Sequence, residues 1–307
     1  MEVGMVGLGR MGGNMARRLT ARGHRVVGYS RTRATVDEHV PYGVVPAYTP
    51  QELVDALTPP RVLWFMYPAG EPTEQAIFQF AEWLQAGDLI VNGANSYYRD
   101  SMRYAERLQE RGIQFVDAGV SGGVWGLENG YGLMVGGAPE SIERITPLLR
   151  DLAPAPDKGW VHVGPVGAGH YAKMIHNGIE YALMQAYAEG FELLRRKQEF
   201  GIDLARVAEA WCHGTVIRSW LLELIAGFLK EDATLREVAP YVADSGEGRW
   251  TAQEAIQLGS PAPLITLALH ERFRSQDEQG FQYRFLAQLR RAFGGHEVSP
   301  SRKESSR

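Results

Sequence analysis

The chain has 307 residues, which is enough for two domains with a sizeable core. Its net charge of −4 offers no basic surface for nucleic acid, and 45% hydrophobic with 22% charged residues is typical of a globular chain. The single cysteine, Cys212, excludes an internal disulfide or zinc knuckle, and no apolar run approaches the roughly 20 residues of a membrane span. The first residues have a strand pattern and not that of a signal peptide, so we expect a cytoplasmic protein without membrane or nucleic-acid partners.

A glycine-rich turn follows the first predicted strand, at residues 3–6. Its G-x-G-x-x-G pattern comprises Gly7, Leu8, Gly9, Arg10, Met11 and Gly12. A helix is expected at 13–19 and a second strand at 24–29, which is the context that a dinucleotide-binding turn requires. The first glycine permits the tight turn, the second lets a pyrophosphate approach the backbone, and the third lets helix and strand pack closely. We therefore predict that these six residues bind the cofactor at a helix N-terminus, with a glycine-rich turn that holds no ligand as the alternative.

The end of the second strand bears on the choice between NAD and NADP. An acidic residue there would bind the ribose 2′-hydroxyl of NAD. This chain has Ser30, Arg31, Thr32 and Arg33 instead, and no carboxylate before Asp37. Arginine forms forked, charge-assisted hydrogen bonds that suit a 2′-phosphate. We assign Ser30, Arg31 and Thr32 to the cofactor site and favour NADP; if the arginines are solvated loop charges, NAD is accepted.

Strands and helices alternate through the rest of the first half. Further strands are predicted at residues 61–66, 88–92, 114–118, 130–137 and 160–163, and helices at 72–84, 101–111 and 139–152. This alternation predicts an α/β fold with an N-terminal Rossmann-type, doubly wound sheet. Ligands of such sheets bind at the carboxyl ends of the strands. Met66 and Asn95 lie at two of these ends, and we assign them to the cofactor site.

Small residues follow the strand predicted at 114–118. Ser121 offers a hydroxyl, and Gly122 and Gly123 expose backbone N–H groups. Such a loop can hold a substrate carboxylate. The alternative is a plain loop of small residues.

Residues 164–197 contain no proline after Pro165 and predict one long helix of roughly 45 Å. The helical repeat places Lys173, His176, Asn177 and Glu180 on one face, and Ile175, Ile179, Ala182 and Ala186 on the opposite face, where packing is expected. An amine and a carboxylate two turns apart can reach two ends of a small substrate, one taking a proton and one giving it. The alternative is a charged solvent face with incidental contacts.

Only helical patterns follow this segment, at 202–211, 219–229, 235–242, 251–258 and 263–275. The sequence thus predicts an NAD(P)-binding domain at 1–164, an all-helical substrate and dimerisation domain at 165–296, and a polar tail at 297–307. Trp211 and Trp220 suggest surface that a partner subunit covers, so we expect a homodimer or homotetramer. The alternative is that both tryptophans fill the core of the monomer.

Six segments together resemble 6-phosphogluconate dehydrogenase, a decarboxylating branch of the β-hydroxyacid dehydrogenase superfamily. They are residues 7–12, 29–32, 93–96, 119–123, 167–181 and 246–251. The fifth is the most specific, because its ending, His176-Asn-Gly-Ile-Glu-Tyr181, is similar to this branch and not to the wider superfamily. The chain resembles the short form of the family, which lacks the C-terminal tail of the long members.

The resemblance implies oxidative decarboxylation of 6-phosphogluconate to ribulose 5-phosphate and CO₂, a reaction of the pentose phosphate pathway and of gluconate utilisation. It implies Lys173 as the base that takes the proton of the 3-hydroxyl, and Glu180 as the acid that protonates C1 of the enediol. The substrate-binding positions that it implies are Asn95, Ser121, Gly122, Gly123, His176, Asn177, Tyr181 and Arg272. The pKa of Lys173 would have to be lowered by desolvation or by a neighbouring cation. No metal is expected, because the protonated lysine would polarise the ketone.

One loop departs from the family pattern. The phosphate loop of the long form, Lys-Gly-Thr-Gly-Lys-Trp, corresponds to residues 245–250 here, with Ser245 in place of a lysine and Glu247 in place of a threonine. A carboxylate repels a phosphate. Either Glu247 points away and Arg249 or Arg272 carries the phosphate, or the substrate is a non-phosphorylated sugar acid or a short hydroxy acid. A third hypothesis is a cofactor-binding protein without catalysis, such as a redox sensor, against which the presence of Lys173 and Glu180 argues.

Overall fold

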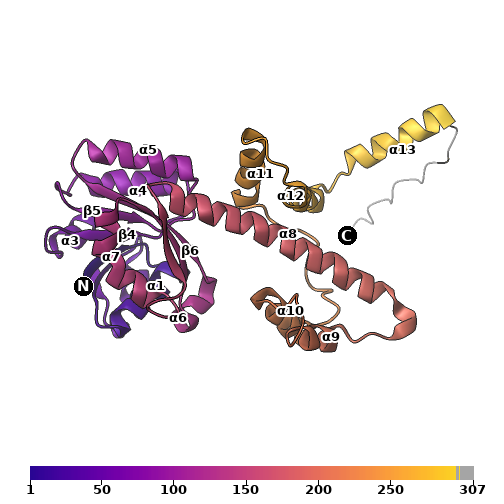
Figure 1. Cartoon of the computed structure of the whole chain (residues 1–307), viewed down its shortest axis with the longest axis horizontal. Coiled ribbons are helices and arrows are strands. Elements are labelled where there is room, and N and C mark those ends of the chain that lie inside the picture. The colour runs from indigo at the N-terminus through magenta and orange to yellow at the C-terminus, as the bar shows by residue number, and fades with distance from the viewer. Residues whose placement is uncertain (295–296, 298–307) are drawn as a thin grey trace. The chain divides into compact units, whose positions relative to one another are not determined.

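The computed structural model describes residues 1–294 and 297 (Figure 1). These residues form two compact units. The first contains Met1–Glu180 together with Gly246–Pro261, and the second contains Tyr181–Ser245 together with the described residues from Ala262 onward. None of the described helices has the length and apolar character that crossing a membrane would require.

The first unit is built on one eight-stranded sheet with the order β3-β2-β1-β4-β5-β6-β7-β8. Its strands are β1 (Glu2–Val6), β2 (Arg25–Tyr29), β3 (Val45–Ala47), β4 (Val62–Phe65), β5 (Leu89–Asn92), β6 (Gln114–Ser121), β7 (Gly132–Gly137) and β8 (Trp160–Gly164). Neighbouring strands run parallel except for β6 and β7, which are antiparallel. The winding reverses between β1 and β4, and a crevice for ligands opens outside the carboxyl ends of strands at such a point.

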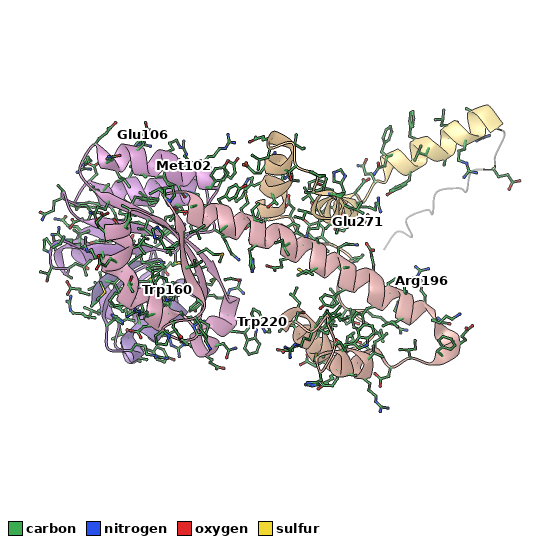
Figure 2. The ribbon with its side chains drawn as sticks, in the orientation of Figure 1. Met102, Glu106, Trp160, Arg196, Trp220 and Glu271 are labelled. Atoms are coloured by element: carbon green, nitrogen blue, oxygen red, sulfur yellow. The ribbon has the colours of Figure 1, made fainter. Side chains whose placement is uncertain are left out.

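Helices bury both faces of this sheet. One apolar cluster joins the strands to α1 (Arg10–Ala21) and α7 (Pro139–Leu152). A second cluster joins them to α3 (Pro50–Asp55), α4 (Glu71–Ala81) and α5 (Tyr98–Gln109). Successive residues of one strand enter different clusters, as Leu63 and Trp64 do, because side chains alternate along a strand. The polar side of α5 faces outward, where Figure 2 shows Glu106.

Every strand predicted from the sequence is present in this sheet, and the α/β class with a doubly wound sheet is confirmed. The helices predicted between these strands also form, and α7 has the predicted bounds. The short elements β3, α2 (Arg33–Asp37), η1 (Val40–Tyr42), α3, η2 (Gly123–Trp125) and α6 (Gly126–Asn129) were not predicted. Each is too short to show a periodic pattern, and β3 also contains Pro46, which is tolerated because β3 is an edge strand.

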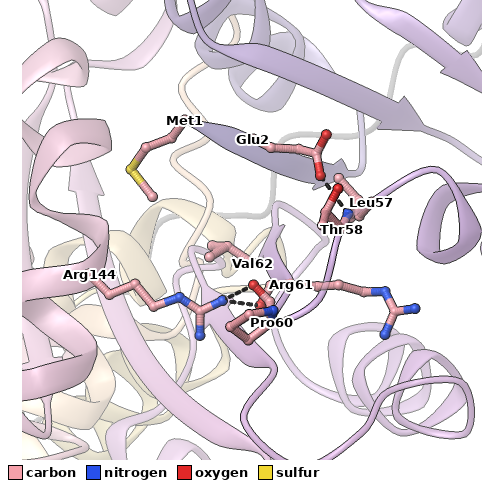
Figure 3. A pocket seen from close by; sticks show the side chains of 8 residues that line it. All are labelled: Met1, Glu2, Leu57, Thr58, Pro60, Arg61, Val62 and Arg144. Atoms are coloured by element: carbon pink, nitrogen blue, oxygen red, sulfur yellow. Dashed lines mark hydrogen bonds between the residues drawn. The ribbon is translucent and has the colours of Figure 1, made fainter.

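The amino ends of β1 and β4 border a cavity of about 290 Å³ (Figure 3). The N–H of Thr58 donates a hydrogen bond to Glu2 Oε1 at 2.6 Å, and Arg144 donates to the carbonyl oxygens of Pro60, Arg61 and Gly87. These polar groups are therefore paired within the chain. The ligand residues that the sequence predicts at strand ends, such as Gly7, Ser30, Met66 and Asn95, follow the opposite, carboxyl ends of the strands.

One 29-residue helix, α8 (Ala168–Arg196), follows the sheet. Its length of about 44 Å confirms the predicted long helix. The carboxylate of Asp117 on β6 accepts hydrogen bonds of 2.6 Å from the N–H groups of Gly167 and His170. These bonds satisfy N–H groups of the first turn that have no partner within the helix, so they fix the start of α8 against the sheet.

The predicted packing face of α8 is wrong for two of its four residues within this chain. Ile179 is 50% exposed and Ala186 is also exposed, while Ile175 and Ala182 are half-buried. The buried side of the first half instead contains Lys173, Met174 and Gly178. The reason is tertiary: α11 (Glu247–Gln257) packs at Gly178, where an added Cβ would lie 2.6 Å from Thr251 Cγ2.

The second unit has a separate small core. The elements of this unit are the second part of α8, η3 (Gln198–Phe200), α9 (Leu204–Trp211), α10 (Trp220–Glu231), α12 (Pro263–Gln276) and α13 (Phe281–Gly294). Leu204 and Ala208 of α9 pack with Leu222, Ala226 and Leu229 of α10. Trp211 lies against this core, with its ring 5.8 Å from that of Phe191, whereas Trp220 is 46% exposed (Figure 2).

The helix predicted at 235–242 is not formed. Asp232 Oδ1 accepts hydrogen bonds from the N–H and hydroxyl of Thr234, which makes a local turn, and Leu235 has a positive φ of 51°. Pro240 has no N–H to donate and disfavours helical backbone at the residue before it. The apolar spacing of this segment therefore does not produce a helix. The helix α13 was not predicted, and of the predicted tail only Glu297 lies within the described residues.

Candidate active site

The glycine-rich turn joins β1 to α1 and has the geometry of a nucleotide cradle. Gly7 has a φ of +100°, and an added Cβ would lie 2.6 Å from the carbonyl oxygen of Met66. A Cβ on Gly12 would lie 2.0 Å from the carbonyl oxygen of Gly7, so helix and turn pack without room for a side chain. A Cβ on Gly9 would meet nothing within 4 Å. Open space therefore lies above Gly9 at the N-terminus of α1, where a pyrophosphate would bind.

The other residues of the turn divide between core and surface. The side chain of Leu8 is buried in the core, so only its backbone is available to a ligand. Arg10 is exposed, while Met11 and Met66 are half-buried against the core at the end of the sheet. The residues present thus fit a dinucleotide through backbone N–H groups, with Arg10 as an additional cation.

The segment after β2 presents an arginine and hydroxyl groups to solvent. Arg31 and Thr32 are exposed, and Thr32 Oγ1 lies 2.6 Å from Thr35 Oγ1 at the start of α2. Arg33 is directed elsewhere: its guanidinium stacks 4.1 Å from the centre of the Tyr48 ring and lies 4.0 Å from Asp37. Arg31 is therefore the better placed of the two guanidiniums to meet a 2′-phosphate.

Two segments of the first unit contain the predicted substrate residues that precede α8, and one of them packs directly on α8. Gly119 on β6 lies so close to α8 that an added Cβ would be 2.3 Å from Lys173 Cβ. Ser121 is the last residue of the same strand, and Gly122 follows it. Both are half-buried, while Gly123 is exposed. Asn95 follows β5 in a loop that hydrogen bonds hold: Asn92 accepts from the N–H of Ala94 and donates to Ser96 Oγ.

The polar residues of α8 are in mutual contact along one face, as predicted. Lys173 Nζ donates a hydrogen bond of 2.7 Å to Asn177 Oδ1 and lies 3.4 Å from His176 Nδ1. Glu180 follows, with Oε2 3.9 Å from His176 Nδ1. Lys173 is only 5% exposed, whereas His176 and Glu180 are much more open to solvent. For Lys173, the alternative of a plain solvent face is therefore excluded.

Burial has an electrostatic consequence for Lys173. Desolvation lowers the pKa of its amine, because a buried ammonium loses hydration, while the carboxylates of Glu180 and Glu247 raise the pKa in part. The net direction is downward. A lysine with a lowered pKa can lose its proton closer to neutral pH and accept one from a substrate hydroxyl.

Glu247 does not point away from these residues, which contradicts one of the two alternatives considered for it. It is only 7% exposed, its Oε1 accepts a hydrogen bond from Asn95 Nδ2, and its charge acts on Lys173. Glu247 is a candidate site residue that was not predicted from the sequence. Its position at the start of α11, among the motif residues, was the signal that could have done so.

Tyr181 and Arg272 belong to the second unit and contact each other there. The guanidinium of Arg272 stacks 3.3 Å from the centre of the Tyr181 ring and donates to the carbonyl oxygen of Ala243. The hydroxyl of Tyr181 lies 3.3 Å from Asp244 Oδ1 and from Ser245 Oγ. This packing orients the guanidinium while its charge remains available to an anion.

Two family models match the chain. The model described as the NAD binding domain of 6-phosphogluconate dehydrogenase matches residues 2–164. The model described as 6-phosphogluconate dehydrogenase, C-terminal domain, matches residues 169–299. Together they account for nearly all of the sequence.

Individual proteins are similar over most of the chain. A protein of Haloferax volcanii named 6-phosphogluconate dehydrogenase, NAD(+)-dependent, decarboxylating, is 42% identical over 300 residues, covering 97% of this chain and 99% of that protein. A Bacillus subtilis protein of the same name is 35% identical over 287 residues, covering 89% of this chain and 61% of that protein. Among solved structures, a 6-phosphogluconate dehydrogenase of Plasmodium falciparum, described as apo and in complexes with its cofactor NADP+ and its substrate 6-phosphogluconate, matches with a TM-score of 0.83. Its identity is 26%, over 99% of this chain and 67% of that chain.

Proposed function

Because the chain belongs to the 6-phosphogluconate dehydrogenase family, we propose that it converts 6-phosphogluconate to ribulose 5-phosphate and CO₂ with reduction of NADP. As a member of this family, it is an NAD(P)-dependent, decarboxylating oxidoreductase. The choice of reaction rests on the buried amine of Lys173, which donates a hydrogen bond to Asn177. Glu180 lies two helical turns further along α8.

Lys173 is the proposed base of the oxidation. The bound nicotinamide cofactor supplies the hydride acceptor for the hydrogen on C3 of the substrate. Lys173 Nζ takes the proton of the 3-hydroxyl, so that a β-keto acid and an ammonium remain. The ammonium then hydrogen-bonds the ketone oxygen, which receives the electrons of the C1–C2 bond as CO₂ leaves, and it returns its proton to give the neutral enediol.

Glu180 is the proposed acid of the last step. The enediol becomes a ketose when the carbon that lost CO₂ gains a proton, which Glu180 donates, and the hydroxyl on the neighbouring carbon loses its proton, which the neutral Lys173 Nζ accepts. Glu180 lies two helical turns from Lys173, and its carboxyl is open to solvent, so that it can be reprotonated between turnovers. The proton acceptor and the proton donor are thereby different side chains on one rigid helix.

The remaining assigned residues hold the substrate. We propose that the carboxylate binds the Ser121, Gly122 and Gly123 loop, and that hydroxyls of the sugar acid bind the other polar side chains of the first unit. Those side chains are Asn95, His176 and Asn177. The phosphate binds Arg272 beside Tyr181, because that guanidinium is held by stacking. Residues 1–164 then hold the cofactor and contribute these loops to the substrate site, and residues 165–296 serve the substrate and subunit contacts.

For the cofactor we propose NADP in preference to NAD, with both accepted. The segment after β2 lacks a carboxylate for the ribose 2′-hydroxyl, and Arg31 is exposed there. The cofactor contacts are proposed for Gly7, Leu8, Gly9, Arg10, Met11, Gly12, Ser30, Arg31, Thr32, Met66 and Asn95. The Haloferax volcanii and Bacillus subtilis proteins are named as NAD(+)-dependent, so this preference is the point at which the chain would differ from them.

A second candidate function is favoured by Glu247. Its carboxylate is buried beside Asn95 and would repel a substrate phosphate placed next to Asn95. An oxidation of a non-phosphorylated sugar acid or a short β-hydroxy acid would use the same Lys173 and Glu180 without this repulsion.

One set of assays tests both candidates. Reduced cofactor is followed with 6-phosphogluconate, with gluconate and with a short β-hydroxy acid, each with NADP and with NAD, and CO₂ is measured in parallel. We expect turnover of 6-phosphogluconate with stoichiometric CO₂. Absence of that turnover with either cofactor would remove the first candidate, and oxidation of gluconate alone would establish the second.

A further inference from the structure

Glu247 holds a position in the first unit that the proton transfers described above do not use. It is the first residue of α11, and its carboxylate accepts a hydrogen bond from Asn95, which lies 152 positions earlier in the sequence. Asn95 is assigned both to cofactor and to substrate. Glu247 is therefore attached to a side chain that both ligands would contact.

The helix that carries Glu247 is fixed against the elements of the site. Thr251 Oγ1 donates a hydrogen bond of 2.8 Å to the carbonyl oxygen of Met174, the residue after Lys173. The ring of Trp250 lies 5.2 Å from that of Tyr97, next to the start of α5. A carboxylate held on a helix packed in this way keeps its place relative to Lys173.

We propose that Glu247 is a positioning residue for the reaction at Lys173: it holds the amide of Asn95 and adds, besides Glu180, a second and buried carboxylate that acts on the amine. The inference rests on the proposed function in one respect, that Lys173 acts as the base. With its Nδ2 turned to Glu247, Asn95 presents Oδ1 to a ligand donor.

The charged groups around Lys173 come from two helices. His176 and Glu180 face the amine from α8, and Glu247 acts on it from α11. Asp117 of β6 is directed at the N–H groups of Gly167 and His170 instead. Because the charge of Glu247 stabilises the ammonium, its removal lets the amine lose its proton at a lower pH.

The chain offers a matched control for this effect. Glu254 lies on the same helix, two turns after Glu247, and is also 7% exposed. It accepts a hydrogen bond from the hydroxyl of Tyr98 and lies 3.8 Å from Arg99, so its carboxylate helps to dock α11 against α5. A general loosening of α11 would affect Glu247→Gln and Glu254→Gln alike.

The test compares the pH dependence of kcat/KM in wild type, Glu247→Gln, Glu247→Ala and Glu254→Gln. We expect Glu247→Gln to move the acid limb to lower pH by about half a unit or more, because the charge is lost. Its kcat on the plateau should stay within a few fold, since glutamine can still accept from Asn95. Glu247→Ala should show the same displacement and about a tenfold lower kcat/KM, because Asn95 is released. An unchanged limb in Glu247→Gln, or an equal displacement in Glu254→Gln, would overturn the proposal.

A substrate-free measurement separates this inference from the proposed function. Trace acetylation at increasing pH, followed by peptide mass spectrometry, reports the protonation of Lys173, with the exposed Lys158 as internal reference. A labelling curve displaced to lower pH in Glu247→Gln supports the inference even if 6-phosphogluconate is not turned over. Identical curves in an enzyme that does turn it over would refute the role of Glu247 and leave the proposed function intact.

Discussion

Lys173 is deeply buried, and its hydrogen-bond partner carries no charge that would balance the charge of the ammonium. Asn177 accepts one of its protons, and the nearest carboxylates lower the cost of the charge only in part. A base in this position needs no metal to change its pKa, because desolvation alone favours the neutral amine. The chemistry of the site therefore depends on a residue whose environment is set by packing.

The first prediction concerns this amine. Lys173→Ala should lower kcat by about 100-fold or more, because alanine has no group to take the hydroxyl proton and positioned bases contribute about 100-fold or more. The measurement is steady-state reduction of cofactor, with a fluorescence titration to show that reduced cofactor still binds. Lys158→Ala, the same change at an exposed position, should retain wild-type rates; a rate within a few fold of wild type in Lys173→Ala would disprove the assignment.

The second prediction concerns stability. Burial lowers the pKa of Lys173 in the folded chain below its value in the unfolded chain. Between these two pKa values the unfolded state binds more protons, so the free energy of unfolding rises with pH in this range. The loss of stability caused by burying the ammonium is therefore largest below the pKa of the folded chain. Lys173→Met removes this dependence.

At neutral pH the melting temperature of Lys173→Met should therefore be higher than that of wild type, although the variant is inactive. Calorimetry or circular dichroism at neutral and at alkaline pH measures both effects, and the difference should shrink as the pH rises. A lower melting temperature for Lys173→Met at neutral pH would show that the hydrogen bond to Asn177 outweighs the burial of the charge.

At this scale, spacing alone predicted that the four polar residues of α8 share a face. It could not predict that Lys173 is buried while His176 is open, because that difference depends on Gly119 of β6 and on α11. Nor could spacing predict that Glu247 contacts Asn95, since this hydrogen bond joins segments that are distant in the sequence.

The turn between β1 and α1 shows how one element makes a binding surface from backbone. Its three glycines have three different surroundings: a positive φ at Gly7, open space at Gly9 and close backbone contact at Gly12. Substitution at the second and at the third glycine should therefore have different effects.

The third prediction follows from this difference. Gly9→Ala should fold with a melting temperature near that of wild type and bind NADPH at least about tenfold more weakly, because the methyl group occupies the space of the pyrophosphate. Gly12→Ala should lose about 2 kcal/mol or more of unfolding free energy, because the new Cβ would overlap the carbonyl oxygen of Gly7. Thermal melts and fluorescence titrations of the two variants check this. Equal stability of both would contradict the geometry of the turn.

Most elements could be predicted because their local signals agree. Strands such as β5 are short apolar runs between turns, and α7 has proline in its first turn and an apolar stripe. The segment 235–242 has helical apolar spacing, but its backbone is directed by Asp232 and Pro240. The antiparallel direction of β7 depends on its partner β6 and has no local signal.

In the molecule as a whole, apolar surface in the second unit supports an oligomer. Helix α10 buries Leu222, Ala226 and Leu229, yet Trp220, Leu224 and Phe228, spaced by one turn on another side, are exposed. A single helix with two apolar sides needs a second partner for one of them. We propose that a second copy of the chain covers this stripe.

The fourth prediction tests the stripe. Wild type should elute with the mass of a dimer or larger in size-exclusion chromatography with light scattering, and Phe228→Glu should lower that mass, because an unpaired charge would enter the interface. Arg206→Gln on α9, a polar change at an exposed position, is the control and should leave the mass unchanged. A monomeric wild type would exclude this explanation of the exposed stripe.

What the sequence by itself determined is seven of the eight strands, most of the longer helices, the glycine-rich turn after β1 and the face of α8 that carries the polar groups. These depend on periodicity and on glycine, which act over a few neighbouring residues. Only the tertiary structure decided that the amine of Lys173 is removed from water, that Glu247 faces Asn95 and that Ile179 remains exposed. The physical reason is that desolvation and charge depend on what packs against a side chain, and these neighbours come from distant parts of the chain.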